Sequence, residues 1–262
     1  MRPRPMLLIA AAVLAVVHVI GVLFARPLWR PAEVVAALCL LAYTIGAGSW
    51  VLTAAAGVLV AGAALTVPEP GGDAGMQVLS PEQYTSLFRQ DQLETLTRVT
   101  AALLFVLLLL VVAVLRRPAP GRAVLGAAAV AALLIIGYAV VRSVVILSAG
   151  PRPTETSWSL GVGAVLPLLL ALAALALAVA AAANRRWRAA AGAVLFVAVA
   201  VIFLDAAVGA VALPYEVRDY AQLFALDLIT ATDAVPQPTL ALTVALQLTA
   251  AILAVAGLSA RR

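Results

Sequence analysis

Long apolar runs recur along this chain, and they constrain its fold more than any other feature. The run Leu160–Ala183, for example, contains no charged side chain. A helix needs about 20 apolar residues to cross about 30 Å of hydrocarbon. Within hydrocarbon the backbone must satisfy its own hydrogen bonds, which leaves helices or closed barrels. Because the runs lack the alternation of barrel strands, the sequence predicts an all-α, polytopic transmembrane helix bundle.

Composition supports this class of protein. Hydrophobic residues make up 65% of the 262 residues and charged residues 11%, whereas soluble domains average about 25% charged. The net charge of +5 comes from arginines alone, since the chain has no lysine. These arginines flank apolar runs, where they set membrane topology. We therefore expect a lipid bilayer, and no nucleic acid, as the partner of the basic residues.

We expect eight spans. The segment from Ala32 to Val67 is long for one span and short for two, and Gly46–Ser49 in its middle is a credible tight turn. If that segment crosses once as a long tilted helix, the total falls to seven. The eight expected spans are Met6–Ala25, Ala32–Ala47, Trp50–Val67, Val99–Leu115, Ala123–Ser148, Leu160–Ala183, Ala190–Leu213 and Thr239–Leu258.

The connectors predict an orientation. Arginines cluster at 116–122 and 185–188 without any acidic residue, and such clusters accumulate on the cytoplasmic side. With eight spans both termini are cytoplasmic, and segments 68–97 and 214–238 lie outside a cell membrane. With seven spans the N-terminus changes sides.

Two polar stretches, 80–97 and 215–235, interrupt the apolar pattern and share a sequence pattern. The shared positions are Tyr84, Leu87, Phe88 and Asp91 in the first stretch and Tyr220, Leu223, Phe224 and Asp227 in the second. The apolar members have i, i+3, i+4 spacing, which predicts an outer amphipathic helix in each stretch. Its apolar face would pack on the protein's own spans, lie among lipid headgroups or dock a partner, and we favour the first.

The first of these helices has a start signal at Ser80-Pro81, and it either runs along the surface or leads directly into the next span. Asp91 and Asp227 could form an outward catalytic pair, but solvated positions on a helix are the better interpretation, because few surface carboxylates are catalytic.

The similar stretches suggest a duplication. Residues 1–120 and 121–262 would each contain three spans, an outer amphipathic segment and a fourth span. Four is an even number, so the two repeats would insert with the same orientation. Chance recurrence of aromatic residues at the membrane interface is the alternative.

Ionisable side chains within apolar runs are costly and mark functional candidates. Arg142 and Asp205 each lie near the outer end of an expected span, so we predict an intramembrane ion pair between two helices. Its preferred role is a helix clamp. The alternative is a proton- or ion-coupled step in which the pair opens and closes.

His18 lies alone in an apolar run and is best interpreted as a hydrogen-bonded core imidazole, with proton relay as a second role. Tyr138 and Ser143 are polar neighbours of Arg142 that suit hydrogen bonds between helices. One histidine, one cysteine and three methionines are too few for a metal site of matched ligands. We expect no metal, no cofactor and no catalytic residue.

Two functions follow for a chain without a catalytic motif. The first is a scaffold or accessory subunit that engages a membrane-protein partner, a second copy or the membrane surface through its outer amphipathic helices. The second is a small secondary transporter with a pathway between the two halves that uses Arg142 and Asp205. The spans contain few polar residues, which favours the first, since a solute pathway needs a polar lining.

Overall fold

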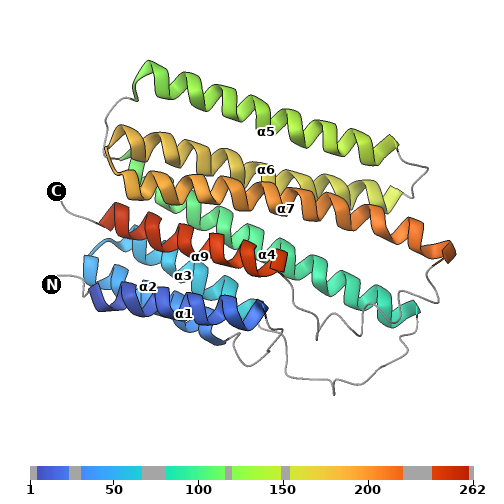
Figure 1. Ribbon diagram of the computed structural model, residues 1–262, viewed down its shortest axis with the longest axis horizontal. Helices are drawn as coiled ribbons and strands as arrows, with labels where there is room; N and C mark the ends of the chain where they lie inside the picture. The colour runs from blue at the N-terminus through green and yellow to red at the C-terminus, as the bar shows by residue number, and fades with distance from the viewer. Residues whose placement is uncertain are drawn as a thin grey trace.

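The protein is helical throughout the part that its computed structural model describes, residues 5–23, 31–66, 81–115, 120–148, 154–220 and 238–259, and these residues contain no strand (Figure 1). Eight helices lie in these ranges. They are α1 (Pro5–Leu23), α2 (Pro31–Ala47), α3 (Trp50–Leu65), α4 (Pro81–Val114), α5 (Arg122–Ser148), α6 (Thr154–Ala183), α7 (Trp187–Tyr220) and α9 (Pro238–Ser259). The predicted all-α class is therefore confirmed.

Six of the described helices are long and apolar enough to cross a membrane, namely α1, α4, α5, α6, α7 and α9. The other two, α2 and α3, are apolar but have only 17 and 16 residues, a length of about 25 Å. That is near the lower limit for a span. The helices fit a membrane bundle, and the count of eight spans stays a prediction.

The break between α2 and α3 lies at the predicted turn. Gly48 follows the last residue of α2 with a φ of +70°, a left-handed conformation in which glycine has no Cβ to clash. Ser49 then caps α3, where its Oγ accepts a hydrogen bond from the backbone N–H of Leu52 at 3.5 Å. Residues 31–65 therefore form two helices and not one long tilted helix.

The helices run alternately up and down. The start of α1 and the end of α9 lie at one end of the bundle, called the terminal end, together with the α2–α3 turn, the end of α4, the start of α5 and the α6–α7 turn (Figure 1). The opposite end is called the far end. The helices do not all reach equally far at the far end. The longer helices α4, α5, α6 and α7, with 27 to 34 residues, continue past the shorter α1 and α9 (Figure 1).

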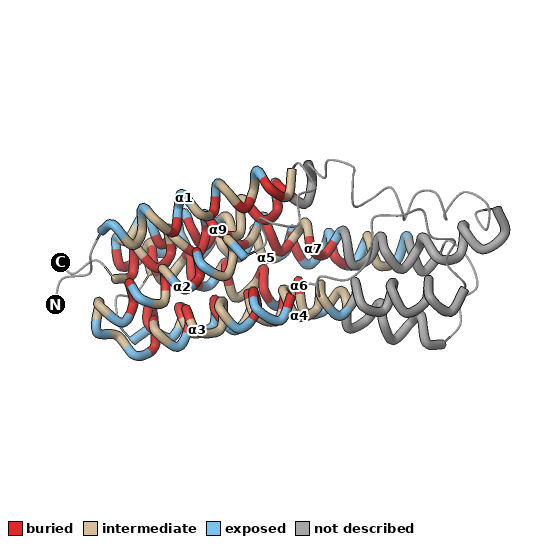
Figure 2. The backbone as a smooth tube through the Cα atoms, turned by 90° about the horizontal axis from the view of Figure 1, so that it is seen from below, coloured by how far each residue is buried: buried red, intermediate tan, exposed pale blue. Residues whose placement is uncertain are grey.

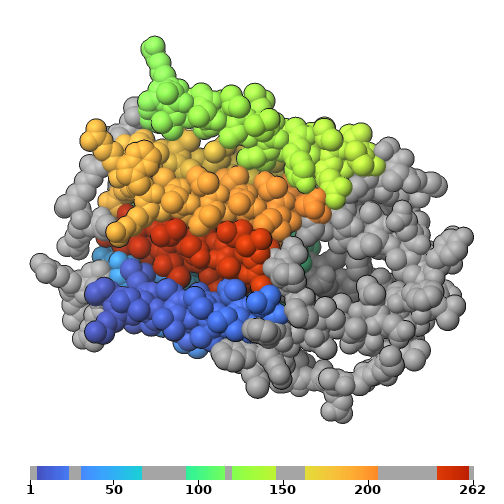
Figure 3. Space-filling view, viewed as in Figure 1, coloured from blue at the N-terminus to red at the C-terminus, as the bar shows by residue number. Residues whose placement is uncertain are grey.

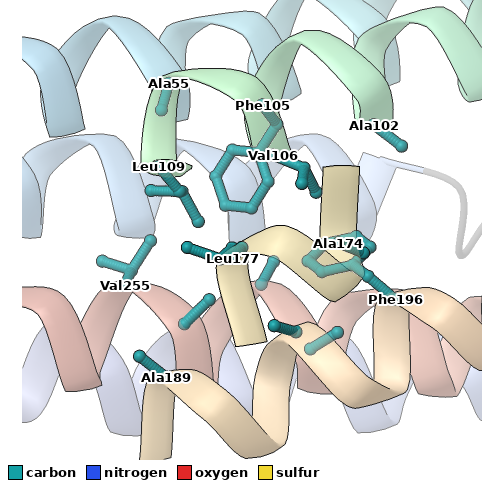
Figure 4. Close-up of a cluster of buried hydrophobic side chains, with 14 of the residues drawn as sticks. Ala55, Ala102, Phe105, Val106, Leu109, Ala174, Leu177, Ala189, Phe196 and Val255 are labelled. Atoms are coloured by element: carbon teal, nitrogen blue, oxygen red, sulfur yellow. The ribbon is translucent and has the colours of Figure 1, made fainter. Parts of the chain in front are cut away.

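One apolar core joins both predicted halves of the chain. The rings of Phe105 on α4 and Phe196 on α7 lie 5.7 Å apart between centroids, at 51°, a tilted arrangement that aromatic pairs favour. Leu109 and Leu177 surround them (Figure 4). Figure 2 shows buried segments that recur along the helices, alternating with intermediate and exposed ones. The predicted boundary at residue 120 does not separate two cores, and the division into repeats stays a prediction.

Glycine allows α7 and α9 to approach closely. A Cβ added at Gly192 would lie 2.6 Å from the carbonyl oxygen of Ala250 and 2.8 Å from the nitrogen of Ala254. A Cβ at Gly257 would meet the backbone of Ala189. Small residues at helix contacts are the means by which membrane helices pack without a hydrophobic driving force between them.

Polar side chains close the helix ends at the terminal end. Arg186 Nη1 donates to the carbonyl oxygens of Gly257, at 2.9 Å, and Leu258, and Asn184 Nδ2 donates to Ala113 O at 3.1 Å. These carbonyls belong to the last turns of α9 and α4, which have no partners within their own helices. The α6–α7 turn is therefore bonded to the ends of both α4 and α9.

The polar stretch 80–97 forms no separate surface helix. It continues without a break into the apolar part of α4, so of the two alternatives the direct connection is found. The second polar stretch behaves differently, because residues up to Tyr220 extend the end of α7. Leu223, Phe224 and Asp227 lie outside the described residues.

Candidate functional site

The predicted partners Arg142 and Asp205 meet between α5 and α7. Arg142 Nε donates to Asp205 Oδ1 at 2.8 Å, and the Tyr138 hydroxyl donates to the same oxygen at 3.0 Å. Tyr138 and Arg142 are four residues apart and therefore share one face of α5. The carboxylate of Asp205 accepts both bonds, which makes it the centre of a three-residue contact.

This contact lies toward the far end of the bundle. Arg142 is about 30 Å along α5 from Arg122, and Asp205 is about 27 Å along α7 from Trp187, at 1.5 Å per residue. Both side chains therefore lie at a similar distance from the terminal end of the bundle. Arg142 is 37% exposed and Asp205 51%. The pair thus lies at the surface of the bundle, and its place within a membrane stays a prediction.

The pair does not bridge the two predicted halves of the chain. Both residues belong to the second predicted half of the chain, so they do not face each other across the two halves. Neither lines the groove between α4, α5 and α6 or the small cavity between α2, α3, α4 and α9. Ser143 follows Arg142 on α5 and is half-buried.

His18 has an acidic neighbour. Its imidazole is 2% exposed, and Nε2 lies 3.3 Å from Oε2 of Glu33, which is 15% exposed. Glu33 occupies the first turn of α2, where the positive end of the helix dipole stabilises a carboxylate. The sequence did not predict this contact, since His18 lies alone in an apolar run and Glu33 lies in another helix.

A small cavity of about 30 Å³, lined mainly by apolar residues, lies beside Glu33, between α2, α3, α4 and α9. Thr66, Arg98 and Gln247 also line it. A space of this size can hold a water molecule where polar groups surround it. Arg98 is itself mostly buried, and its Nη2 lies 2.9 Å from Oε1 of Glu94 on the same helix.

We call His18, Glu33, Arg98 and Gln247 the polar cluster. Its residues come from α1, α2, α4 and α9, so it joins helices of both predicted halves. An imidazole next to a carboxylate can hold and transfer a proton. No three His, Cys, Asp or Glu side chains come together as metal ligands anywhere in the described ranges.

The amphipathic faces are placed only in part. Tyr84, Leu87, Phe88 and Asp91 lie in the first four turns of α4, and Tyr220 is the last residue of α7. The side chains of these five residues lie outside the described part of the structure. Their predicted shared face therefore stays a prediction.

Comparison with known proteins gives no relative from which a function could be transferred. No family model, no curated protein and no solved structure matches the chain.

Proposed function

We propose that the chain is a non-catalytic scaffold or accessory subunit of a cell membrane, which engages a partner membrane protein on the outer side. The observation that carries this proposal is the length of α4 and α7, which have 34 residues each. Such helices are about 51 Å long and exceed the hydrocarbon by about 20 Å. Both extend past the shorter helices at the far end (Figure 1).

A rigid extension of this kind suits recognition of a partner. The first turns of α4 carry Tyr84, Leu87 and Phe88 at i, i+3, i+4 spacing, within a polar sequence. An amphipathic helix of this pattern can dock its apolar face into a groove of another protein. The extension continues directly from a span whose core residues, such as Phe105, are fully buried, so its direction is fixed by the bundle.

The proposed topology has eight spans and the terminal end in the cytoplasm. The arginines Arg122, Arg185, Arg186 and Arg188 all lie at the terminal end, and the sequences of its connectors contain no acidic residue. The positive-inside rule then directs the far end, with the extensions of α4 and α7, to the outside.

Transport is a second candidate, which the polar cluster favours. A buried His18–Glu33 pair beside a cavity large enough for water resembles the proton-holding groups of ion-coupled transporters. The larger described cavity has apolar walls, which do not suit a polar solute. We therefore rank a scaffold above a transporter.

The proposal is tested by the size of the protein in gentle detergent extracts of its own membranes. We expect the full chain to migrate in a complex larger than one chain. The variant Tyr84→Ser/Leu87→Ser/Phe88→Ser should reduce that complex to the single chain, because it removes the apolar face. The matched control, Glu82→Gln/Ser86→Ala/Arg89→Gln, changes the opposite face and should leave the complex intact.

A wild-type chain that migrates alone, or a control variant that dissociates the complex equally, contradicts the scaffold proposal. Proton uptake into vesicles that contain only the purified protein, lost in Glu33→Gln, would favour the transporter instead.

A further inference from the structure

Helix α5 is loosely attached to the bundle and leaves a groove beside it. Only 6% of the residues in the apolar stretch of α5 are buried, compared with 56% for α9. Helix α5 lies along one edge of the molecule (Figure 3). Among the described side chains of α5, the buried ones are Ile135 and Ala139, two turns and one turn before Arg142. The half of α5 near the far end is therefore held by packing and by the Asp205 contact, and the half near the terminal end is not.

The groove lies between this loosely held half of α5, the end of α4 and the end of α6. Its volume is about 600 Å³, within the range of about 300–1,000 Å³ typical of small-molecule sites. The walls are apolar and include Leu110 of α4, Leu125 and Ala132 of α5 and Leu172 of α6. Asn184 lies at its terminal end.

The length of the groove matches one leaflet of a bilayer. Ala132 is about 15 Å along α5 from Arg122, and Leu172 is about 17 Å along α6 from Ala183. Half of the hydrocarbon thickness is also about 15 Å. A transmembrane helix of a partner would need a surface along the whole of α5, but the groove ends where Ile135 packs into the core.

Exposed arginines lie at the terminal end of the bundle, where the groove also ends. Arg122 begins α5, Arg185 follows the groove residue Asn184, and Arg188 lies in the first turn of α7. All three are exposed, whereas Arg186 is bonded to the end of α9. Basic residues at the cytoplasmic ends of transmembrane helices attract anionic lipid headgroups.

From this geometry we infer that the α4–α5–α6 groove binds one acyl chain of an anionic phospholipid of the cytoplasmic leaflet, with the headgroup phosphate beside Arg122, Arg185 and Arg188. This inference uses the orientation proposed above, but it does not depend on the scaffold role. Burial of the acyl chain stabilises the protein–lipid complex through apolar contact, and the arginines select an anionic headgroup.

The test uses the purified, delipidated full chain and native mass spectrometry with two probes, phosphatidylglycerol and phosphatidylcholine with identical acyl chains. We expect preferential retention of phosphatidylglycerol. Arg122→Gln and Arg188→Gln should each reduce that preference about fivefold, the factor expected for one basic residue at a lipid surface.

A second variant tests the groove itself. Ala176 lines the groove and is exposed on α6, so Ala176→Phe fills the groove without disturbing the core. It should lower retention of phosphatidylglycerol about tenfold, since exclusion of two methylenes already has an effect of that order. Ala127→Phe, on an exposed position of α5 outside the groove, should leave retention unchanged.

Equal retention of both lipids by the wild type, or unchanged retention in Ala176→Phe, overturns the inference. Conversion of an oligomer to single chains by Ala176→Phe, with lipid retention unchanged, also overturns it and assigns the groove to a second copy. Failure of the outer-face variants to dissociate a complex would count against the scaffold role alone.

Discussion

The contact of Tyr138 and Arg142 with Asp205 should act as a clamp that holds α5 to α7. Two hydrogen bonds converge on one oxygen, at 2.8 and 3.0 Å. Charged hydrogen bonds contribute up to about 3 kcal/mol when buried, but exposed ion pairs contribute at most about 1 kcal/mol. Because the two charged side chains are 37% and 51% exposed, we expect a coupling free energy of about 1 kcal/mol.

The assay is a double-mutant cycle with Arg142→Gln and Asp205→Asn, in which the free energy of unfolding is measured in mixed micelles. Each single variant and the double variant should have similar stabilities, which is the mark of a direct interaction. The Arg142→Asp/Asp205→Arg exchange should recover part of the loss. Strictly additive effects, below about 0.3 kcal/mol of coupling, would refute the clamp.

The distance between α5 and α7 shows whether the pair holds the two helices together or only adds to the stability of the fold. Spin labels at Val140 on α5 and Val194 on α7, both exposed, report the separation of the two helices. Asp205→Asn should broaden this distance distribution, because α5 has few other buried contacts. As a control, Glu94→Gln breaks a pair within α4 and should leave the distribution unchanged.

Three further substitutions test the packing. Gly192→Ala should lower the free energy of unfolding by about 1–3 kcal/mol, because its Cβ would overlap α9. The control Gly137→Ala should leave that free energy unchanged, because its Cβ would meet no atom within 4 Å. Phe105→Ala should cost about 3 kcal/mol in that assay, since the ring is fully buried. Glu33→Leu should lower the free energy of unfolding by about 2 kcal/mol, because it leaves the buried His18 next to an apolar side chain. Wild-type stability of Gly192→Ala, Phe105→Ala or Glu33→Leu, or a destabilised Gly137→Ala, would contradict the corresponding expectation.

Much of the helical framework could be predicted from the sequence, because hydrocarbon permits little else. The apolar runs predict the helices, and the small, flexible residues at Gly48 and Ser49 predict the break between α2 and α3. Arg142 and Asp205 could be paired because each is a similar number of residues from the end of its run, and equal rise per residue puts them at similar heights.

The polar cluster could not be predicted in the same way. Glu33 and Arg98 lie at the ends of apolar runs, where the sequence pattern suggests solvated positions. Their burial depends on which helices pack around them, and the local sequence does not indicate that arrangement.

The sequence did weakly indicate the continuous helix α4, because no glycine or proline interrupts it from Glu82 to Arg117.

The peripheral position of α5 could not be predicted from the sequence either. In a membrane, residues that face lipid are as apolar as residues that face other helices. Val130 and Leu133, which are exposed on α5, are therefore indistinguishable by hydropathy from the buried Val106 of α4. Tertiary packing alone separates the two environments.

The central claim is an up-and-down bundle of eight spans with its arginine-rich end in the cytoplasm, and thiol labelling of Trp50→Cys tests it most directly. Trp50 is 80% exposed at the start of α3, and Cys39→Ala removes the native thiol. A membrane-impermeant maleimide should label Gln90→Cys in intact cells, and should label Trp50→Cys and Gly121→Cys only after permeabilisation. Labelling of Trp50→Cys in intact cells, or its absence after permeabilisation, would contradict the topology.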